Sequence, residues 1–78
     1  MMKSRYVYRN QDITLDIMLK IEHVVRLIAE ETGKSFDDCL YEFYQSKVYA
    51  MLQKTSSLMW AESAEFITDE FFRENKVL

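Results

Sequence analysis

Aliphatic residues recur at spacings of three and four positions after Ile13, as they do on one face of an α-helix. The stripe comprises Ile17, Ile21, Val24 and Ile28, with Met18 and Val25 flanking it. Polar residues occupy the opposite face: Asp16, Lys20, His23, Arg26 and Glu30. The pattern predicts an amphipathic helix that ends at Gly33, because glycine takes the left-handed closing conformation most readily. Three good capping residues leave its start open: Asn10, Asp12 and Thr14.

A second helix is predicted to begin after Ser35, whose hydroxyl can accept a hydrogen bond from a first-turn amide. Asp37 and Asp38 follow it and place negative charge at the positive end of the helix dipole. The predicted inner face comprises Phe36, Leu40, Phe43 and Tyr44, with a buried Cys39 beside them. The helical pattern continues towards Leu52, and a break near residues 45–47 stays open because Ser46 can cap a fresh turn.

The chain is interrupted at residues 55–57, a run of Thr and Ser. The three residues that follow are too few to show a period, and we expect an extended or loop segment that buries Trp60. Ser63 is predicted to cap a last helix that frays around Asn75. Its apolar face comprises Ala64, Ile67 and Phe71.

Near the N-terminus, tyrosines alternate with other residues in the order RYVYR, which is typical of an extended strand. The sequence therefore predicts an all-α fold: a compact single domain over residues 1–78, with three to four helices. Residues 1–11 form a short, basic, extended N-terminal arm, and residues 12–75 form the helical core.

Composition supports helices by excluding other folds. The 78 residues include one glycine, no proline and one cysteine. Sandwiches and barrels need frequent turn residues, and a nucleotide-binding loop needs several glycines. A single cysteine excludes an intrachain disulfide and a thiolate zinc cluster. Hydrophobic residues make up 49% of the chain and aromatic residues 14%, which is enough for a folded core. A homodimer interface that adds to this burial stays open.

The net charge is −3, but residues 1–10 alone carry +3. An acidic body with a short basic arm is not typical of a dedicated nucleic-acid binder. The basic start is not followed by an apolar run of signal-peptide length, and no stretch is apolar enough to cross a membrane. We therefore expect a cytoplasmic bacterial protein with no membrane contact.

Reactive side chains are few. His23 lies on a polar helix face without a group to orient it as a base. Cys39 follows two aspartates, whose charge opposes thiolate formation. The acidic residues occur as sequence neighbours, which diverge on a helix. We predict no catalytic residue, no bound cofactor and no metal site.

The tyrosines are the best candidates for contact with a partner. Aromatic side chains beside basic ones are suited to a protein interface or to stacking on nucleic acid, and the alternative is that they rim the core. The predicted partner-binding residues are Arg5, Tyr6, Tyr8, Arg9, Tyr41 and Tyr49.

Residues 4–50 resemble the ribbon-helix-helix repressors. The resemblance lies in a short strand, RYVYR, then a helix ending in LIAEETGKS, then DDCLYEFYQS. It implies a dimer formed through the strand, whose side chains enter the major groove of DNA. A DNA-binding repressor is therefore the alternative function.

A longer segment, residues 13–74, resembles a family of small helical bacterial proteins classed as a domain of unknown function. The matching features are the run from Phe43 to Lys47, then Tyr49, Leu52, Leu58, Trp60, Glu62, Ser63 and the pair Phe66 and Ile67. Some members of that family are encoded beside genes that look like ADP-ribosyltransferase-type toxins. The resemblance implies an accessory or antitoxin-like role and, as partner, the product of a neighbouring gene. We therefore expect a protein–protein interaction module rather than an enzyme.

Overall fold

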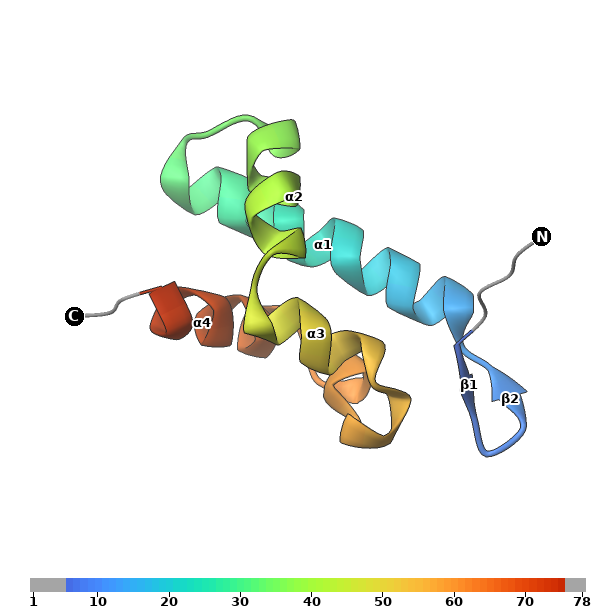
Figure 1. Cartoon of the computed structure of the whole chain (residues 1–78). Coiled ribbons are helices and arrows are strands. Elements are labelled where there is room, and N and C mark those ends of the chain that lie inside the picture. Colours follow the sequence, from blue (N-terminus) through green and yellow to red (C-terminus); the bar gives the residue numbers. More distant parts are fainter. Residues whose placement is uncertain (1–5, 76–78) are drawn as a thin grey trace.

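Four α-helices dominate the part of the chain that the structure describes, residues 6–75 of a computed structural model (Figure 1). The helices are α1 (Thr14–Thr32), α2 (Phe36–Tyr44), α3 (Lys47–Gln53) and α4 (Ala64–Asn75). Two single 3₁₀ turns, η1 (Thr55–Ser57) and η2 (Met59–Ala61), join α3 to α4, and a small hairpin of β1 (Val7–Tyr8) and β2 (Gln11–Asp12) precedes α1. The predicted all-α fold with a short N-terminal arm is confirmed.

The N-terminal arm is a two-stranded antiparallel hairpin in which Val7 pairs with Asp12 and Tyr8 with Gln11. Arg9 and Asn10 form the turn with φ values of +50° and +66°. Two consecutive left-handed residues match the twist of a tight hairpin, and asparagine tolerates that conformation well. The predicted strand therefore finds its hydrogen-bonding partner in its own chain.

The hairpin also explains why our three candidate caps for α1 were wrong. The helix begins at Thr14, and its N-cap residue is Ile13, which provides no side-chain hydrogen bond. Asn10 is used in the hairpin turn, and the Thr14 hydroxyl accepts a hydrogen bond from the Tyr6 backbone N–H at 2.8 Å. Asp12 lies nearest to a capping role, since its Oδ1 accepts from the Thr14 N–H at 3.0 Å. The far end is as predicted, with Gly33 at φ +76° and its N–H bonded to the Ala29 carbonyl at 2.8 Å.

Serine hydroxyls begin the other three helices, as predicted for Ser35 and Ser63, and the break that the sequence left open at Ser46 is present. The chain breaks at Gln45 and Ser46, so α2 and α3 are separate helices. Each hydroxyl accepts a hydrogen bond from a backbone N–H three residues later. The pairs are Ser35 with Asp38 at 3.1 Å, Ser46 with Tyr49 at 3.0 Å, and Ser63 with Phe66 at 3.0 Å.

Of the two alternatives predicted for the segment before α4, extended or loop, the structure has a loop, which consists of two short 3₁₀ turns. Leu58 takes a left-handed conformation with φ +61° between the two 3₁₀ turns, so the chain reverses direction within a few residues. Trp60 is half-buried rather than fully covered, and its indole N–H donates to the Thr55 carbonyl at 2.9 Å. That bond closes the compact turn, which an extended segment would leave open.

The core lies where α1, α2, α3 and α4 meet, and α1 packs against both α2 and α4. Phe43 is fully buried at its centre, with ring centroids 5.9 Å from Phe71 and 5.6 Å from Tyr49. The other fully buried side chains are Ile17, Val24, Val25, Ile28, Cys39, Leu52 and Ile67. The predicted stripe of the first helix is thus largely confirmed, and Cys39 is the buried thiol that we expected.

Candidate protein-interaction surface

An apolar groove runs between α1 and α2, and we call it the α1–α2 groove. It has a volume of about 220 Å³. Five of its six lining residues are aliphatic or aromatic, and Glu22 is the sixth. The others are Met18 and Ile21 from α1 and Phe36, Leu40 and Tyr44 from α2. These apolar side chains line the groove, where water can reach them, and are not fully buried in the core.

The first half of α1 has two further exposed apolar side chains besides Met18, and one of them, Leu19, lines a separate hollow. Met18 is 57% exposed, and Leu15 and Leu19 are 66% and 57% exposed. Spacings of three and four positions put these three side chains on one side of the helix. On α2, Tyr44 is 47% exposed. Contiguous apolar surface of this kind on a small protein marks an interaction site more often than an isolated exposed leucine does.

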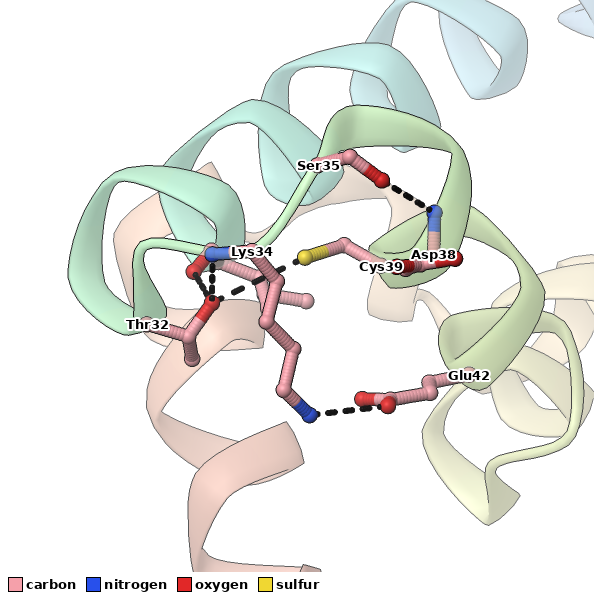
Figure 2. Close-up of polar contacts among 7 residues, drawn as sticks. Thr32, Lys34, Ser35, Asp38, Cys39 and Glu42 are labelled. Carbon is pink, nitrogen blue, oxygen red and sulfur yellow. Dashed lines mark hydrogen bonds and ion pairs between the residues drawn. The ribbon is translucent and has the colours of Figure 1, made fainter.

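Figure 2 shows the polar contacts of the tight corner between α1 and α2. The Thr32 hydroxyl donates to the Ile28 carbonyl at 2.8 Å and lies 3.7 Å from the Cys39 Sγ. The Lys34 ammonium contacts the Glu42 carboxylate at 2.9 Å, so the linker is held to the second half of α2. This carboxylate raises the pKa of Lys34 through the hydrogen bond and its charge. The contacts on both sides of Gly33 hold α2 at a fixed angle to α1.

The prediction that Phe36 and Tyr44 face the core was wrong. The side chains of α2 that point inward are Cys39 and Phe43, whereas Phe36 and Tyr44 are exposed and Leu40 is half-buried. Met18, which the sequence placed beside the buried stripe, is exposed as well. Helix α2 is rotated about its axis so that one part of its apolar face packs in the core and the other part lines the groove. A nine-residue helix with two apolar strips admits either rotation, and only the packing decides between them.

The exposed part of α1 could have been found from the sequence. Leu15, Met18 and Leu19 continue the apolar positions around the helix, beyond the width that one packed face requires. A stripe that is too wide for the core indicates a second face in contact with something else. That excess is the sequence signal for the surface described here.

Five of the six predicted partner-binding residues lie in the described part of the chain, and Arg5 lies outside it. Tyr41 projects from α2 and is 68% exposed. Tyr8 packs edge-on against Trp60 with ring centroids 5.4 Å apart, and the Arg9 guanidinium lies 5.4 Å from the Tyr8 ring centroid. The structure thus brings Tyr8 and Arg9 together at the hairpin and places Tyr41 on another element.

The remaining two tyrosines join the hairpin to α3. The Tyr6 hydroxyl accepts a hydrogen bond from the Gln53 Nε2 at 3.0 Å. Tyr49 packs against Tyr44 with ring centroids 4.8 Å apart. Burial raises the pKa of Tyr49, and the nearby hydroxyls of Tyr6 and Tyr44 raise it further. These contacts give Tyr6 and Tyr49 a packing role within the chain.

The raised pKa of Tyr49 predicts a loss of stability at high pH. Folding favours the neutral phenol, so this contribution is complete below the usual pKa of 10.0 and is lost as the pH rises through the higher folded value. We expect urea unfolding curves to show a fall in unfolding free energy between pH 9 and pH 11, roughly. Tyr49→Phe should reduce this slope, while Tyr41→Phe, at an exposed tyrosine, should keep it. An unchanged slope in Tyr49→Phe would contradict the prediction.

The other candidate reactive groups are dispersed. His23 is exposed and lines a separate hollow of about 330 Å³, together with Asp16, Leu19, Lys20, Trp60 and Ala61. Within residues 6–75, no three His, Cys, Asp or Glu side chains gather closely enough to hold a metal ion. In the same residues, no helix combines the length and hydropathy needed to cross a membrane.

We compared the chain with protein-family models, curated proteins and solved structures. No family model, no curated protein and no solved structure matches the chain.

Proposed function

We propose that this protein is a protein–protein interaction module that binds an amphipathic helix of a partner protein in the α1–α2 groove. One observation carries the proposal: the groove between α1 and α2 is open to water and has an apolar lining, which includes the exposed side chains of Met18, Phe36 and Tyr44. Covering that surface would remove apolar area from water, which is the main driving force of association.

A helix is the occupant that best suits this groove. Two helices form its walls, and Phe36, Leu40 and Tyr44 are spaced by four positions along one ridge of α2. Such ridges accept the side chains of a third helix, as in helical bundles. Helix-in-groove recognition uses apolar residues at spacings of three, four and seven on the bound helix. The partner therefore presents one apolar stripe of this kind.

The biological role in this proposal is accessory or antitoxin-like, without catalysis, as the resemblance of residues 13–74 implies. The same resemblance implies that the partner is the product of a neighbouring gene. The ribbon-helix-helix alternative needs residues 4–10 to pair with a second copy. Val7 and Tyr8 instead pair with Gln11 and Asp12 of the same chain, so no observation favours that alternative.

The proposal is tested with a synthetic 18-residue helical peptide, roughly five turns long, that has leucines on one face and glutamine elsewhere. Titrated into the isotope-labelled protein, it should shift amide resonances along the groove. Met18→Glu puts a charge on the apolar surface and should weaken binding about tenfold, since a charge there is desolvated on docking. Met51→Glu is the matched control, because Met51 is a 43% exposed methionine on α3.

The control variant should bind as the unmodified protein does. A scrambled peptide of the same composition, with its leucines spread around the helix, should not bind. The proposal is overturned if the amphipathic peptide binds no better than the scrambled one, or if Met18→Glu leaves its affinity unchanged.

A further inference from the structure

We infer that Met18 is a site of reversible oxidation, at which a peroxide converts the thioether to the sulfoxide and thereby weakens binding of the partner helix in the α1–α2 groove. This inference rests on the proposed function, since it concerns the regulation of the same site. Two observations carry it. Met18 is the most exposed of the sulfur-containing residues that the structure describes, and its side chain lines the groove.

The sulfur-containing residues differ widely in their exposure to water. The chain has five methionines and one cysteine, and Met18, Met51, Met59 and Cys39 are those in the part of the chain that the structure describes. Met18 is 57% exposed, Met51 is 43% exposed and Met59 is half-buried against the core. The thiol of Cys39 is fully buried. Because oxidation of a sulfur depends on access of the oxidant, Met18 is oxidised first among these four.

The reaction needs a peroxide as its only co-reactant. The thioether sulfur attacks one oxygen of hydrogen peroxide, so that an S–O bond forms and the O–O bond breaks. The sulfur gives up two electrons, and the second oxygen leaves as hydroxide. This hydroxide takes the proton from the transferred oxygen, so the products are the sulfoxide and water. Methionine sulfoxide reductases return the sulfoxide to the thioether, which makes the modification reversible.

A sulfoxide at Met18 places a polar group in an apolar groove. The other lining residues are aliphatic or aromatic except Glu22, whose carboxylate pairs with Arg26. Water solvates the sulfoxide oxygen while the groove is empty, and the apolar stripe of a bound helix offers that oxygen no hydrogen-bond donor. Docking then removes the water without replacing its hydrogen bond, which lowers the affinity.

Oxidation of Met18 acts on the groove and not on the fold. The buried residues of α1 are Ile17, Val24, Val25 and Ile28. Met18 belongs neither to the core nor to the partly buried side chains that pack against it. A change confined to its side chain therefore leaves the packing of the four helices in place.

The test uses the whole protein, reduced or treated with hydrogen peroxide, and the leucine–glutamine peptide described above. Mass spectrometry of proteolytic fragments should find the sulfoxide at Met18 earlier than at Met59. Oxidation of Met18 should weaken peptide binding about tenfold while the far-ultraviolet circular dichroism spectrum stays the same. Treatment with the reductases for both sulfoxide epimers should restore the affinity.

Two leucine variants assign the effect to one sulfur. Met18→Leu keeps an apolar side chain of similar size, so it should bind the peptide as the unmodified protein does and keep that affinity after peroxide treatment. Met51→Leu is the matched control, because it removes the other exposed methionine of the described residues. It should lose affinity on oxidation as much as the unmodified protein does.

The outcomes separate the two proposals. If the reduced protein binds the peptide and oxidation of Met18 leaves the affinity unchanged, this inference falls while the proposed function stands. If Met18→Leu loses affinity on oxidation as the unmodified protein does, another residue is responsible and the inference falls. Oxidation of Met18 no earlier than Met59 would also overturn it. If the reduced protein does not bind the peptide, the proposed function falls and this inference falls with it.

Discussion

Replacing Phe43 with alanine is expected to lower the free energy of unfolding by about 3–5 kcal/mol. Phe43 is fully buried and contacts the rings of both Phe71 and Tyr49, so it links α2 to α3 and α4. Removing the ring leaves a cavity that three helices cannot all close. A chain of this length is typically stable by on the order of 4–12 kcal/mol, so the variant should be close to unfolding at 25 °C.

Urea unfolding followed by circular dichroism at 222 nm, roughly the helical minimum, measures this loss. Tyr41→Ala is the matched control, because Tyr41 lies on the same helix and is 68% exposed. That variant should change the unfolding free energy by less than about 0.5 kcal/mol. Equal stability of the two variants would mean that Phe43 does not occupy the centre of the core.

The second large effect is expected at Glu74, whose carboxylate caps α3 from the last turn of α4. Its Oε2 accepts the Lys47 N–H at 2.8 Å, and its Oε1 accepts the Val48 N–H at 3.1 Å. Hydrogen bonds to a charged group contribute more than neutral ones. Because one side chain serves both amides, Glu74→Ala should lower the unfolding free energy by about 1.5–3 kcal/mol.

Asp69→Ala is the control for this prediction, since it removes one negative charge from an exposed position of the same helix. It should change stability by less than about 0.5 kcal/mol. Glu74→Gln keeps one acceptor oxygen, so its unfolding free energy should lie between those of Glu74→Ala and Asp69→Ala. Hydrogen exchange at the amides of Lys47 and Val48 should be faster in Glu74→Ala. The prediction is wrong if those amides keep their protection.

Features that depend on neighbouring residues were predictable from the sequence. Gly33 ends α1 and Ser35, Ser46 and Ser63 begin the next three helices, because each acts on backbone groups within a few positions. The burial of Cys39 follows from its place in an apolar helix turn. Boundaries of this kind need no knowledge of what the rest of the chain does.

The prediction of the residue that caps α1 was wrong because that cap depends on a residue distant in the sequence. Thr14 is a good cap in isolation, but a residue eight positions earlier, Tyr6, uses its hydroxyl. Glu74 is a similar case, since nothing near α3 in the sequence shows that its first amides are satisfied from α4. Long-range hydrogen bonds of this kind depend on the packing of whole helices.

The candidate site was only partly accessible to sequence reasoning. The tyrosines were singled out for their exposure, yet Tyr6, Tyr8 and Tyr49 have packing partners in the chain. The groove residues Met18, Phe36 and Tyr44 were assigned to the core or its edge because they are apolar and helically spaced. Period alone shows that a residue belongs to an apolar face, but it does not show which of two faces meets the core.

The sequence by itself determined an all-α fold, the glycine corner and the serine-capped helices, because those depend on backbone geometry and local hydrogen bonds. The tertiary structure decided the rotation of α2, the hairpin's attachment to α3, and the exposed apolar α1–α2 groove. A chain of 78 residues offers more apolar side chains than one small core can enclose. Which of them remain in contact with water is settled only when all the helices pack at once.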